Sequence, residues 1–422
     1  MQNANTIKIA LGLALGLQAT AFAGTEAPAV EPTPPKSFEW CSWLQDSPGT
    51  LYKNKENPYL QEFKLEGRFQ YQAAYLDGSD VNGRDYNETY DEYRRVRIGA
   101  KAKFLQYFGA KVSLNMVEDT RFVPANLGSL EWGYSSFDEA YLSFDLGKAI
   151  GGDWFDSLWV NYGREKFTLG IESVESSTKL LTVERSAISN KVYGSARPTG
   201  VSVEGEKGDW NFKTALYSTT RDGLQNEAFN GWQDSVMWYA NIGYQVNDEL
   251  NVFADFVYNY ADFEAGDNII LPYRWAGSLN ADYNAGKWGI IGEFIYGDNG
   301  GSEFGRNAEL DGNFWGAVVM PYYWLIEDKL QLVGQYQYQG AQGDNGARVN
   351  SRYSRASGTG VGTNVDVNSG RGDSQNALYA GLNYYLCGNN LKIQGGIEYQ
   401  TMDTPKGDFD TLTYILAFRT YF

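Results

Sequence analysis

The stretch Thr411-Leu-Thr-Tyr-Ile-Leu-Ala-Phe-Arg-Thr-Tyr-Phe422 decides the fold. Its alternate positions form two faces of different polarity. One face carries Leu412, Tyr414, Leu416 and Phe418, and the other carries Thr411, Thr413, Ile415, Ala417 and Arg419. A period of two residues is typical of a β-strand with one apolar side and one wetter side. We therefore expect a strand that runs to the aromatic residue Phe422.

This segment resembles the terminal strand of bacterial outer-membrane barrels, whose last residue is typically Phe. The other end of the chain agrees with that resemblance. Residues 1–23 combine Lys8, an apolar core at 9–17 and the sequence Ala21-Phe22-Ala23, which is the pattern of a secretory signal peptide. The apolar core is too short to span a bilayer. We expect an exported protein, and a retained N-terminal anchor is the alternative.

The composition suits strands and excludes several classes of protein. The chain has 48 glycines, 31 tyrosines and 15% aromatic residues, and after the signal it has no run of 18 apolar residues. A net charge of -17 argues against nucleic-acid binding, so no nucleic-acid partner is expected. Histidine is absent, which removes His-based catalysis and the commonest metal ligand. We expect no enzyme, no metal site and no cofactor.

From about residue 60 the period of two continues, with short and long connections in alternation. This pattern predicts an all-β fold: a transmembrane antiparallel β-barrel of about 16 strands, with short periplasmic turns and long extracellular loops. The expected strands are near 61–76, 92–105, 109–118, 136–147, 157–168, 192–206, 210–220, 235–247, 250–262, 271–284, 288–298, 312–324, 330–341, 374–386, 391–402 and 410–422. The predicted organisation is a signal peptide at 1–23, a Pro-rich periplasmic lead at 24–57 and the barrel at 58–422.

The first three expected strands carry an excess of basic residues. Eight bases, Arg94 among them, stand against Glu62, Glu66, Glu92 and Glu118. The bases that we select as candidates for an anion path in these strands are Lys64, Arg68, Arg95, Arg97, Lys101, Lys103 and Lys111. Arg and Lys lining a pore favour anions and phosphate. The alternative is that they pair with lumen carboxylates and only brace the wall.

Three other features lie outside the strands. The partly apolar segment 169–186 is too long for a tight turn and could fold inward to narrow the pore. Cys41 and Cys387 could form a disulfide in the oxidising periplasm, or remain two separate thiols. Four arginines of the long loop 342–373 could attract anions at the mouth, or belong to a solvated loop that contacts lipopolysaccharide. These are Arg348, Arg352, Arg355 and Arg371.

Four stretches of the chain resemble the phosphate-selective porin O/P family of trimeric outer-membrane channels. They are Arg94-Arg95-Val-Arg97-Ile-Gly, Asp138-Glu-Ala-Tyr-Leu142, Gly163-Arg-Glu-Lys-Phe-Thr-Leu-Gly170 and Leu181-Thr-Val-Glu-Arg-Ser186. The resemblance implies a sixteen-stranded barrel whose third loop folds inward at the constriction. It also implies that Lys179 and Arg185 lie in that loop and that Arg95 and Arg97 lie on the facing wall.

We therefore expect a porin of the bacterial outer membrane that passes small hydrophilic solutes passively and prefers anions such as phosphate. Its expected partners are outer-membrane lipid, lipopolysaccharide, small anions and two further copies of the chain in a homotrimer. A general or sugar-type porin and a structural or adhesive barrel are the alternatives. In both, the bases would not select the permeating ion.

Overall fold

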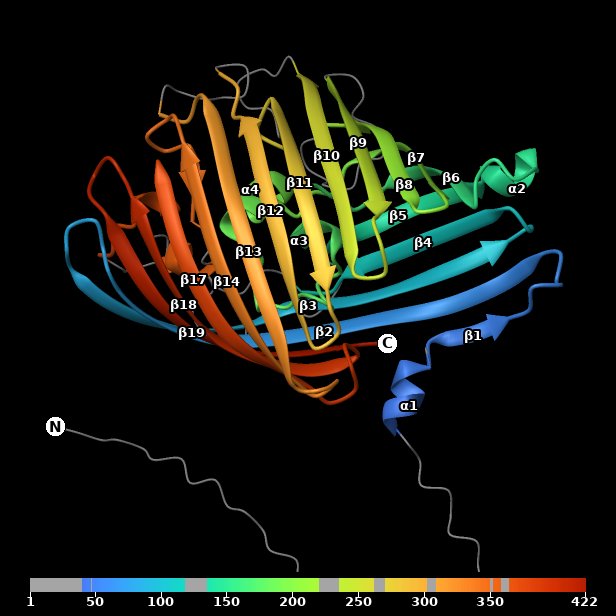
Figure 1. The fold of residues 1–422 in the computed structure, drawn as a ribbon, viewed down its shortest axis with the longest axis horizontal. Helices are drawn as coiled ribbons and strands as arrows, with labels where there is room; N and C mark the ends of the chain where they lie inside the picture. The colour runs from blue at the N-terminus through green and yellow to red at the C-terminus, as the bar shows by residue number, and fades with distance from the viewer. Residues whose placement is uncertain are drawn as a thin grey trace, which may run out of the picture. The chain divides into compact units, whose positions relative to one another are not determined.

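The computed structural model describes residues 40–46, 48–117, 135–219, 235–261, 270–301, 309–349, 352–357 and 364–422. The expected signal peptide and half of the Pro-rich lead lie outside these ranges. The described part is dominated by antiparallel strands that form a closed barrel (Figure 1). Within it, no helix is long and apolar enough to cross a membrane.

Sixteen of the described strands form the barrel wall, which confirms the predicted fold class. These strands are β2 (Leu60–Ser79), β3 (Asp85–Phe104), β4 (Phe108–Asn115), β5 (Ser136–Asp145), β6 (Ser157–Arg164), β7 (Thr199–Lys207), β8 (Trp210–Ser218), β9 (Ser235–Gln245), β10 (Leu250–Ala261), β11 (Trp275–Asn284), β12 (Trp288–Asp298), β13 (Asn313–Ile326), β14 (Leu330–Ala341), β17 (Ser374–Tyr385), β18 (Leu391–Asp403) and β19 (Phe409–Tyr421). Each pairs with its neighbours along the chain, and β19 pairs with β2 to close the ring. Closure leaves no unpaired edge, as a lipid environment demands.

Smaller elements complete the described chain. They are α1 (Trp40–Gln45), β1 (Thr50–Lys53), α2 (Leu146–Ile150), α3 (Ile171–Val174), α4 (Ala187–Tyr193), β15 (Ala347–Arg348), α5 (Arg352–Ser357), η3 (Asn368–Gly370) and β16 (Arg371–Gly372). β1 pairs with the first residues of β2, so the end of the predicted lead extends the sheet.

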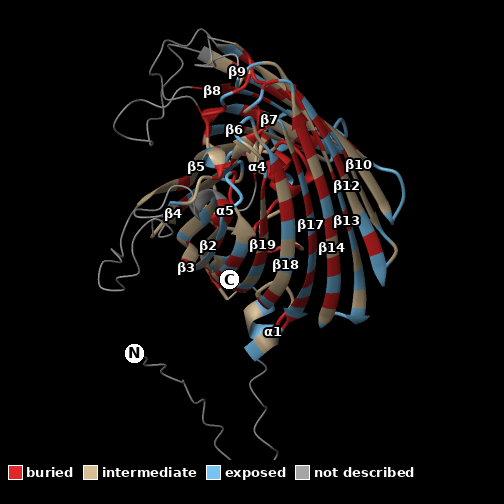
Figure 2. Ribbon diagram, turned by 90° about the vertical axis from the view of Figure 1, so that its left-hand side faces the viewer, coloured by how far each residue is buried: buried red, intermediate tan, exposed pale blue. Residues whose placement is uncertain are grey.

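The alternation of side chains along each strand separates an outer face from a lumen face. In β17 every second residue is buried, and Figure 2 shows alternating bands of buried and exposed residues along β13, β14 and β17. On β19 the outward residues Tyr414 and Leu416 are exposed, whereas Thr413 and Arg419 are buried inside. The terminal strand therefore has the two faces that its sequence predicts.

Two predicted strands begin seven residues from the expected position. The strand expected at 92–105 begins earlier, because β3 starts at Asp85 and pairs with β2 over its whole length. The range 192–206 was expected to be extended, but the chain forms α4 up to Tyr193 and enters β7 only at Thr199. Ser186 begins this helix because its Oγ accepts a hydrogen bond from the backbone of Ser189, and Gly194 ends it in the left-handed conformation. The helix turns Ile188 and Val192 into the barrel interior, where both are buried. Tertiary packing thus overrides the local period of two.

An apolar core lies inside the barrel rather than between layers of sheet. It joins residues of the segment 165–198, such as Phe167 and Ile188, to the lumen face of β8 to β13. The strand residues that contribute, such as Tyr217 and Phe314, lie near the strand ends that adjoin the long loops. On this side the extracellular half of the lumen is therefore filled by protein.

Candidate pore and its constriction

The segment 165–198, called the inner loop here, runs from β6 to β7 through the barrel interior and contains α3 and α4 (Figure 1). The segment 169–186 therefore folds into the barrel, as predicted. The loop is held from the opposite wall by long polar side chains. Gln70 donates to the carbonyl of Ser177 at 3.1 Å, and Lys392 donates to that of Leu180 at 2.9 Å. Such hydrogen bonds satisfy backbone groups that are removed from water.

The first turn of α3 is fixed by β10, β11 and β12. The backbone N–H of Gly170 donates to Asp255 Oδ2 at 2.9 Å, and that of Ile171 donates to Asn280 Oδ1 at 3.0 Å. Gly170 has a φ of 85°, and a Cβ at this position would collide with the carboxylate of Glu293. Only glycine fits both the backbone angle and the close approach of the wall.

On the side of β2 to β5, the inner loop leaves a cavity of about 570 Å³, called the basic cavity here. Eleven basic and three acidic side chains line it. The bases are Arg68, Arg94, Arg95, Arg97, Lys101, Lys111, Lys166, Lys179, Arg185, Arg197 and Arg352, and the acids are Glu66, Asp138 and Glu139. This concentration of positive charge occurs in a chain whose net charge is -17.

Seven of the nine predicted anion-path residues line the basic cavity, and Lys64 and Lys103 do not. These two lie on the same face of the wall, near the periplasmic ends of β2 and β3. Arg185 lines the cavity, but its Nε donates to the carbonyl of Glu172 at 2.5 Å and its Nη2 to that of Glu175 at 3.1 Å. Its guanidinium therefore also holds the inner loop in shape.

A β-bulge explains why two consecutive arginines face the lumen. The pairing of β2 with β3 shifts register between Gln70 and Tyr71, so that Arg95 pairs with Gln70 and Tyr93 with Tyr71. Arg94 is the extra residue, and its guanidinium donates to Glu184 of the inner loop at 2.7 and 3.1 Å. A bulge re-aims a side chain in this way. The period of two alone would turn Arg94 away from the lumen.

Several of the bases are paired with carboxylates. Asp138 lies between Arg97 and Arg197, at 2.7 and 2.8 Å. Lys111 contacts Glu139 at 2.5 Å, and Lys101 contacts Glu66 at 2.7 Å. These pairs brace the wall, as the alternative interpretation of the basic residues proposed.

Arg352 and Arg94 extend the pairing toward the extracellular side. Arg352 contacts Glu92 with two hydrogen bonds of 2.7 Å, so part of the loop 342–373 folds inward against β3. Although burial opposes ionisation of Glu184, Arg94 holds the pKa of that carboxyl well below its usual range. Glu184 thus remains charged beside its arginine.

Five lining bases have no carboxylate partner among the described residues: Arg68, Arg95, Lys166, Lys179 and Arg185. Arg68 donates to Ser177 Oγ at 2.8 Å, and Arg95 donates to Gln70 Oε1 at 2.8 Å. Hydroxyl and amide groups orient a guanidinium without cancelling its charge. The pKa of Lys166 is lowered to about 7, chiefly by burial and also by Arg185 and Arg197, against an opposing effect of Tyr193.

Sequence reasoning missed Lys166 and Arg197 as lining residues. It placed them in the expected strands 157–168 and 192–206, whereas both lie in the inner loop. Arg352 was noted only as a residue of the outer loop. At the periplasmic end, a disulfide joins Cys41 in α1 to Cys387 in the turn between β17 and β18. The helix α1 is thereby attached to the barrel.

The residues that line the basic cavity fall largely in the part of the chain that is recognisable by sequence. Residues 63–238 match the family of phosphate-selective porins O and P. The match confirms the predicted resemblance over that stretch, and it covers β2 to β8 and the whole inner loop. Among the curated protein sequences that were compared, none matches the chain.

Solved structures share the barrel. The loop-deletion form of OmpT from Vibrio cholerae is 13% identical with a TM-score of 0.55, covering 85% of this chain and 99% of that chain. The channel DcaP of Acinetobacter baumannii is 13% identical with a TM-score of 0.53, covering 87% and 100%. OmpF of Salmonella typhi is 14% identical with a TM-score of 0.51, covering 88% and 99%. At these identities the likeness shows the fold. The family match and the closed barrel with its apolar outer face confirm the predicted location in the bacterial outer membrane.

Proposed function

We propose that this protein is a porin through which small hydrophilic solutes diffuse passively, with a preference for anions such as phosphate. The observation that carries the proposal is the lining of the basic cavity, with eleven basic side chains against three acidic ones. Rings and ladders of Arg and Lys favour anions in pores. The proposal therefore assigns a preference for anions over cations to a barrel of the porin fold.

The arrangement of the inner loop supports a solute path along β2 to β5. On the side of β8 to β13 the apolar core fills the extracellular half of the lumen. On the side of β17 to β19 the inner loop is hydrogen-bonded to the wall, as in the contact of Asn383 with the carbonyl of Leu181 at 2.8 Å. Water and ions are thereby directed to the basic cavity.

The mechanism follows from the unequal pairing of the bases. Arg68 and Arg95 offer guanidinium donors that replace part of the hydration of an anion. The paired bases, such as Arg97 with Asp138, contribute less net field but fix the wall. Binding at each site is shared with protein oxygens and is therefore weak enough for the ion to move to the next site.

The reversal potential of the purified protein in a planar bilayer under a KCl gradient tests the preference. We expect an anion-directed potential and a chloride current that phosphate blocks when titrated. A potential near zero or cation-directed, without phosphate block, would leave a general porin, in which the carboxylate pairs neutralise the wall. An absence of conductance would favour the structural or adhesive barrel.

Arg68→Gln and Lys179→Gln are the informative variants, because neither residue has a carboxylate partner among the described residues. A unit charge about 8 Å from the ion path in water contributes roughly 0.5 kcal/mol. Each variant should thus lower the anion-to-cation permeability ratio by roughly fivefold before screening, since anions lose and cations gain this energy. Lys55→Gln, at an exposed position that does not line the basic cavity, is the matched control.

We also propose a homotrimer. A trimer form of OmpT from Vibrio cholerae, 11% identical with a TM-score of 0.52, supports this assembly state by analogy of fold. Native mass spectrometry of the detergent-solubilised protein should give three times the mass of the chain. A monomer mass after mild extraction would refute the proposal without affecting the ion preference.

A further inference from the structure

The opposite side of the inner loop carries a second cavity of about 650 Å³, called the acidic cavity here. Its walls are the periplasmic halves of β11 to β14, the turns at 327–329 and 386–389, and the inner loop near Glu175 and Leu181. The helix α1 contributes Cys41 and Gln45, and the disulfide holds this helix in place. The cavity therefore lies at the periplasmic end of the barrel.

The cavity is closed on its extracellular side. The strands β11 to β13 line it with residues near their periplasmic ends, such as Asp282 and Tyr322. The same strands contribute the other end of their lumen face, such as Ile295 and Phe314, to the apolar core. A solute can therefore enter from the periplasm but meets packed protein above. This shape fits a binding site better than a path.

The charge of the acidic cavity is opposite to that of the basic cavity. Five carboxylates line it, against Lys179 and Lys329. The carboxylates are Glu172, Glu175, Asp282, Glu327 and Asp328. Apart from Glu172, which accepts hydrogen bonds from Ser186 and Gln335, they have no ion-pair or side-chain hydrogen-bond partner among the described residues. A buried oxygen of Asp282, Oδ1, lacks any hydrogen-bond donor there.

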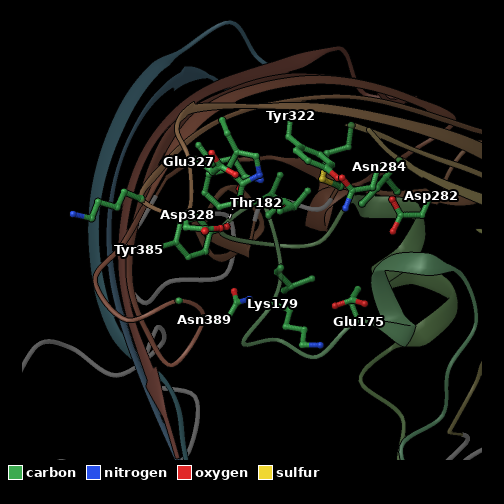
Figure 3. A pocket seen from close by; sticks show the side chains of 18 of the residues that line it. Glu175, Lys179, Thr182, Asp282, Asn284, Tyr322, Glu327, Asp328, Tyr385 and Asn389 are labelled. Carbon is green, nitrogen blue, oxygen red and sulfur yellow. Dashed lines mark hydrogen bonds between the residues drawn. The ribbon is translucent and has the colours of Figure 1, made fainter. Parts of the chain in front are cut away.

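Apolar and aromatic side chains lie between these carboxylates. Figure 3 shows Tyr322 and Tyr385 on the wall, with Asp282 toward one end of the cavity and Glu327 and Asp328 toward the other. Ligand sites of this kind are mostly apolar, carry a few placed polar groups and measure roughly 300–1,000 Å³. Aromatic faces also attract a cation directly.

We propose that the acidic cavity binds an amphipathic organic cation from the periplasm, an ammonium or guanidinium group attached to an aromatic or alkyl body. The cation lies near Asp282, whose unpartnered oxygen it satisfies, and the body packs against Tyr322 and its apolar neighbours. This site goes beyond the proposed porin function and does not depend on its ion preference. The reversal potential reports on the basic cavity, whereas ligand binding reports on the acidic one.

Isothermal titration calorimetry of the full chain in nonionic detergent at pH 7, with benzylammonium as the probe, tests the proposal. We expect saturable binding to the unmodified protein and roughly five- to tenfold weaker binding to Asp282→Asn, which removes one charge without changing size. Asp248→Asn, an equal change at an exposed periplasmic turn outside the cavity, should bind as the unmodified protein does. A heat-modifiable shift on SDS gels confirms that each variant is folded.

Two further probes separate charge from shape. Methylammonium lacks the aromatic ring and should bind at least tenfold more weakly, whereas benzenesulfonate has the opposite charge and should not bind. Met320→Trp, which narrows the cavity, should abolish binding of the benzyl probe. Three results would overturn the proposal: no binding to the folded unmodified protein, equal binding to Asp282→Asn and Asp248→Asn, or equal binding of the anionic probe.

Discussion

Asp138 offers the sharpest test of how the basic cavity is held together, because one buried carboxylate contacts two arginines. Its side chain is 6% exposed, and it contacts Arg97 at 2.7 Å and Arg197 at 2.8 Å. Removing one partner of a buried ion pair costs about 3–5 kcal/mol, because the remaining charge is left uncompensated. Asp138→Asn keeps one acceptor oxygen, so we expect a loss near the lower limit, about 3 kcal/mol. That is a large fraction of a typical unfolding free energy of about 5–15 kcal/mol.

Urea-induced unfolding in phospholipid vesicles, followed by tryptophan fluorescence, measures this loss. The matched control is Asp156→Asn at a periplasmic turn, where the carboxylate contacts Lys207 at 3.4 Å and both side chains are more than half exposed. Such surface pairs contribute little, so the control should unfold as the unmodified protein does. Asp138→Asn should also give a more anion-directed reversal potential, since the cavity loses one of three acidic groups. Equal unfolding free energies of the two variants would refute the role assigned to Asp138.

Three further predictions concern the inner loop and α1. Because burial lowers the pKa of Lys166 to about 7, the lysine is mostly charged at pH 6 and mostly neutral at pH 8. The anion preference, measured as the reversal potential, should therefore fall between pH 6 and pH 8, and Lys166→Met should remove this pH dependence. Glu184→Gln should destabilise the barrel by about 3 kcal/mol in urea, because it leaves a buried arginine unpaired; an unchanged midpoint would contradict the assignment. Replacing Cys41 and Cys387 by Ser should expose α1, which buries no residue, to chymotrypsin at Trp40 and Trp43 while the barrel resists. Equal cleavage of the oxidised protein would show that the disulfide does not hold the helix.

The strands were predictable because lipid outside and water inside impose a single period on every one of them. The predicted range 288–298 coincides with β12, and 330–341 coincides with β14. The inner loop was harder to place, because some of its residues pack in the apolar core while others line the basic cavity. Ile188 and Val192 are apolar enough for a lipid-facing strand, yet they pack into the lumen core because the loop crosses it.

The role of single bases was less predictable than their presence. Arg95 and Arg97 were correctly expected on the wall that faces the inner loop. The inward turn of Arg94 depends on a register shift, which the sequence does not reveal. Arg185 donates hydrogen bonds to the carbonyls of Glu172 and Glu175, and these bonds depend on a loop conformation that only tertiary contacts fix.

The net charge of -17 does not indicate which sign of ion the lumen favours, because the charged residues that line the lumen are unevenly distributed. The inner loop divides the charged lining into two groups, with eleven bases on the side of β2 to β5 and five carboxylates on the side of β11 to β17. In salt of physiological strength, exposed charges act over about 8 Å, so an ion on one side responds mainly to its own lining. Lys179 lines both cavities, and it is the described residue at which the two fields meet within the inner loop. Lys179→Glu should for this reason weaken anion preference more than Lys179→Gln while strengthening binding of the organic cation, a pair of opposite effects that a uniform lumen charge would not produce.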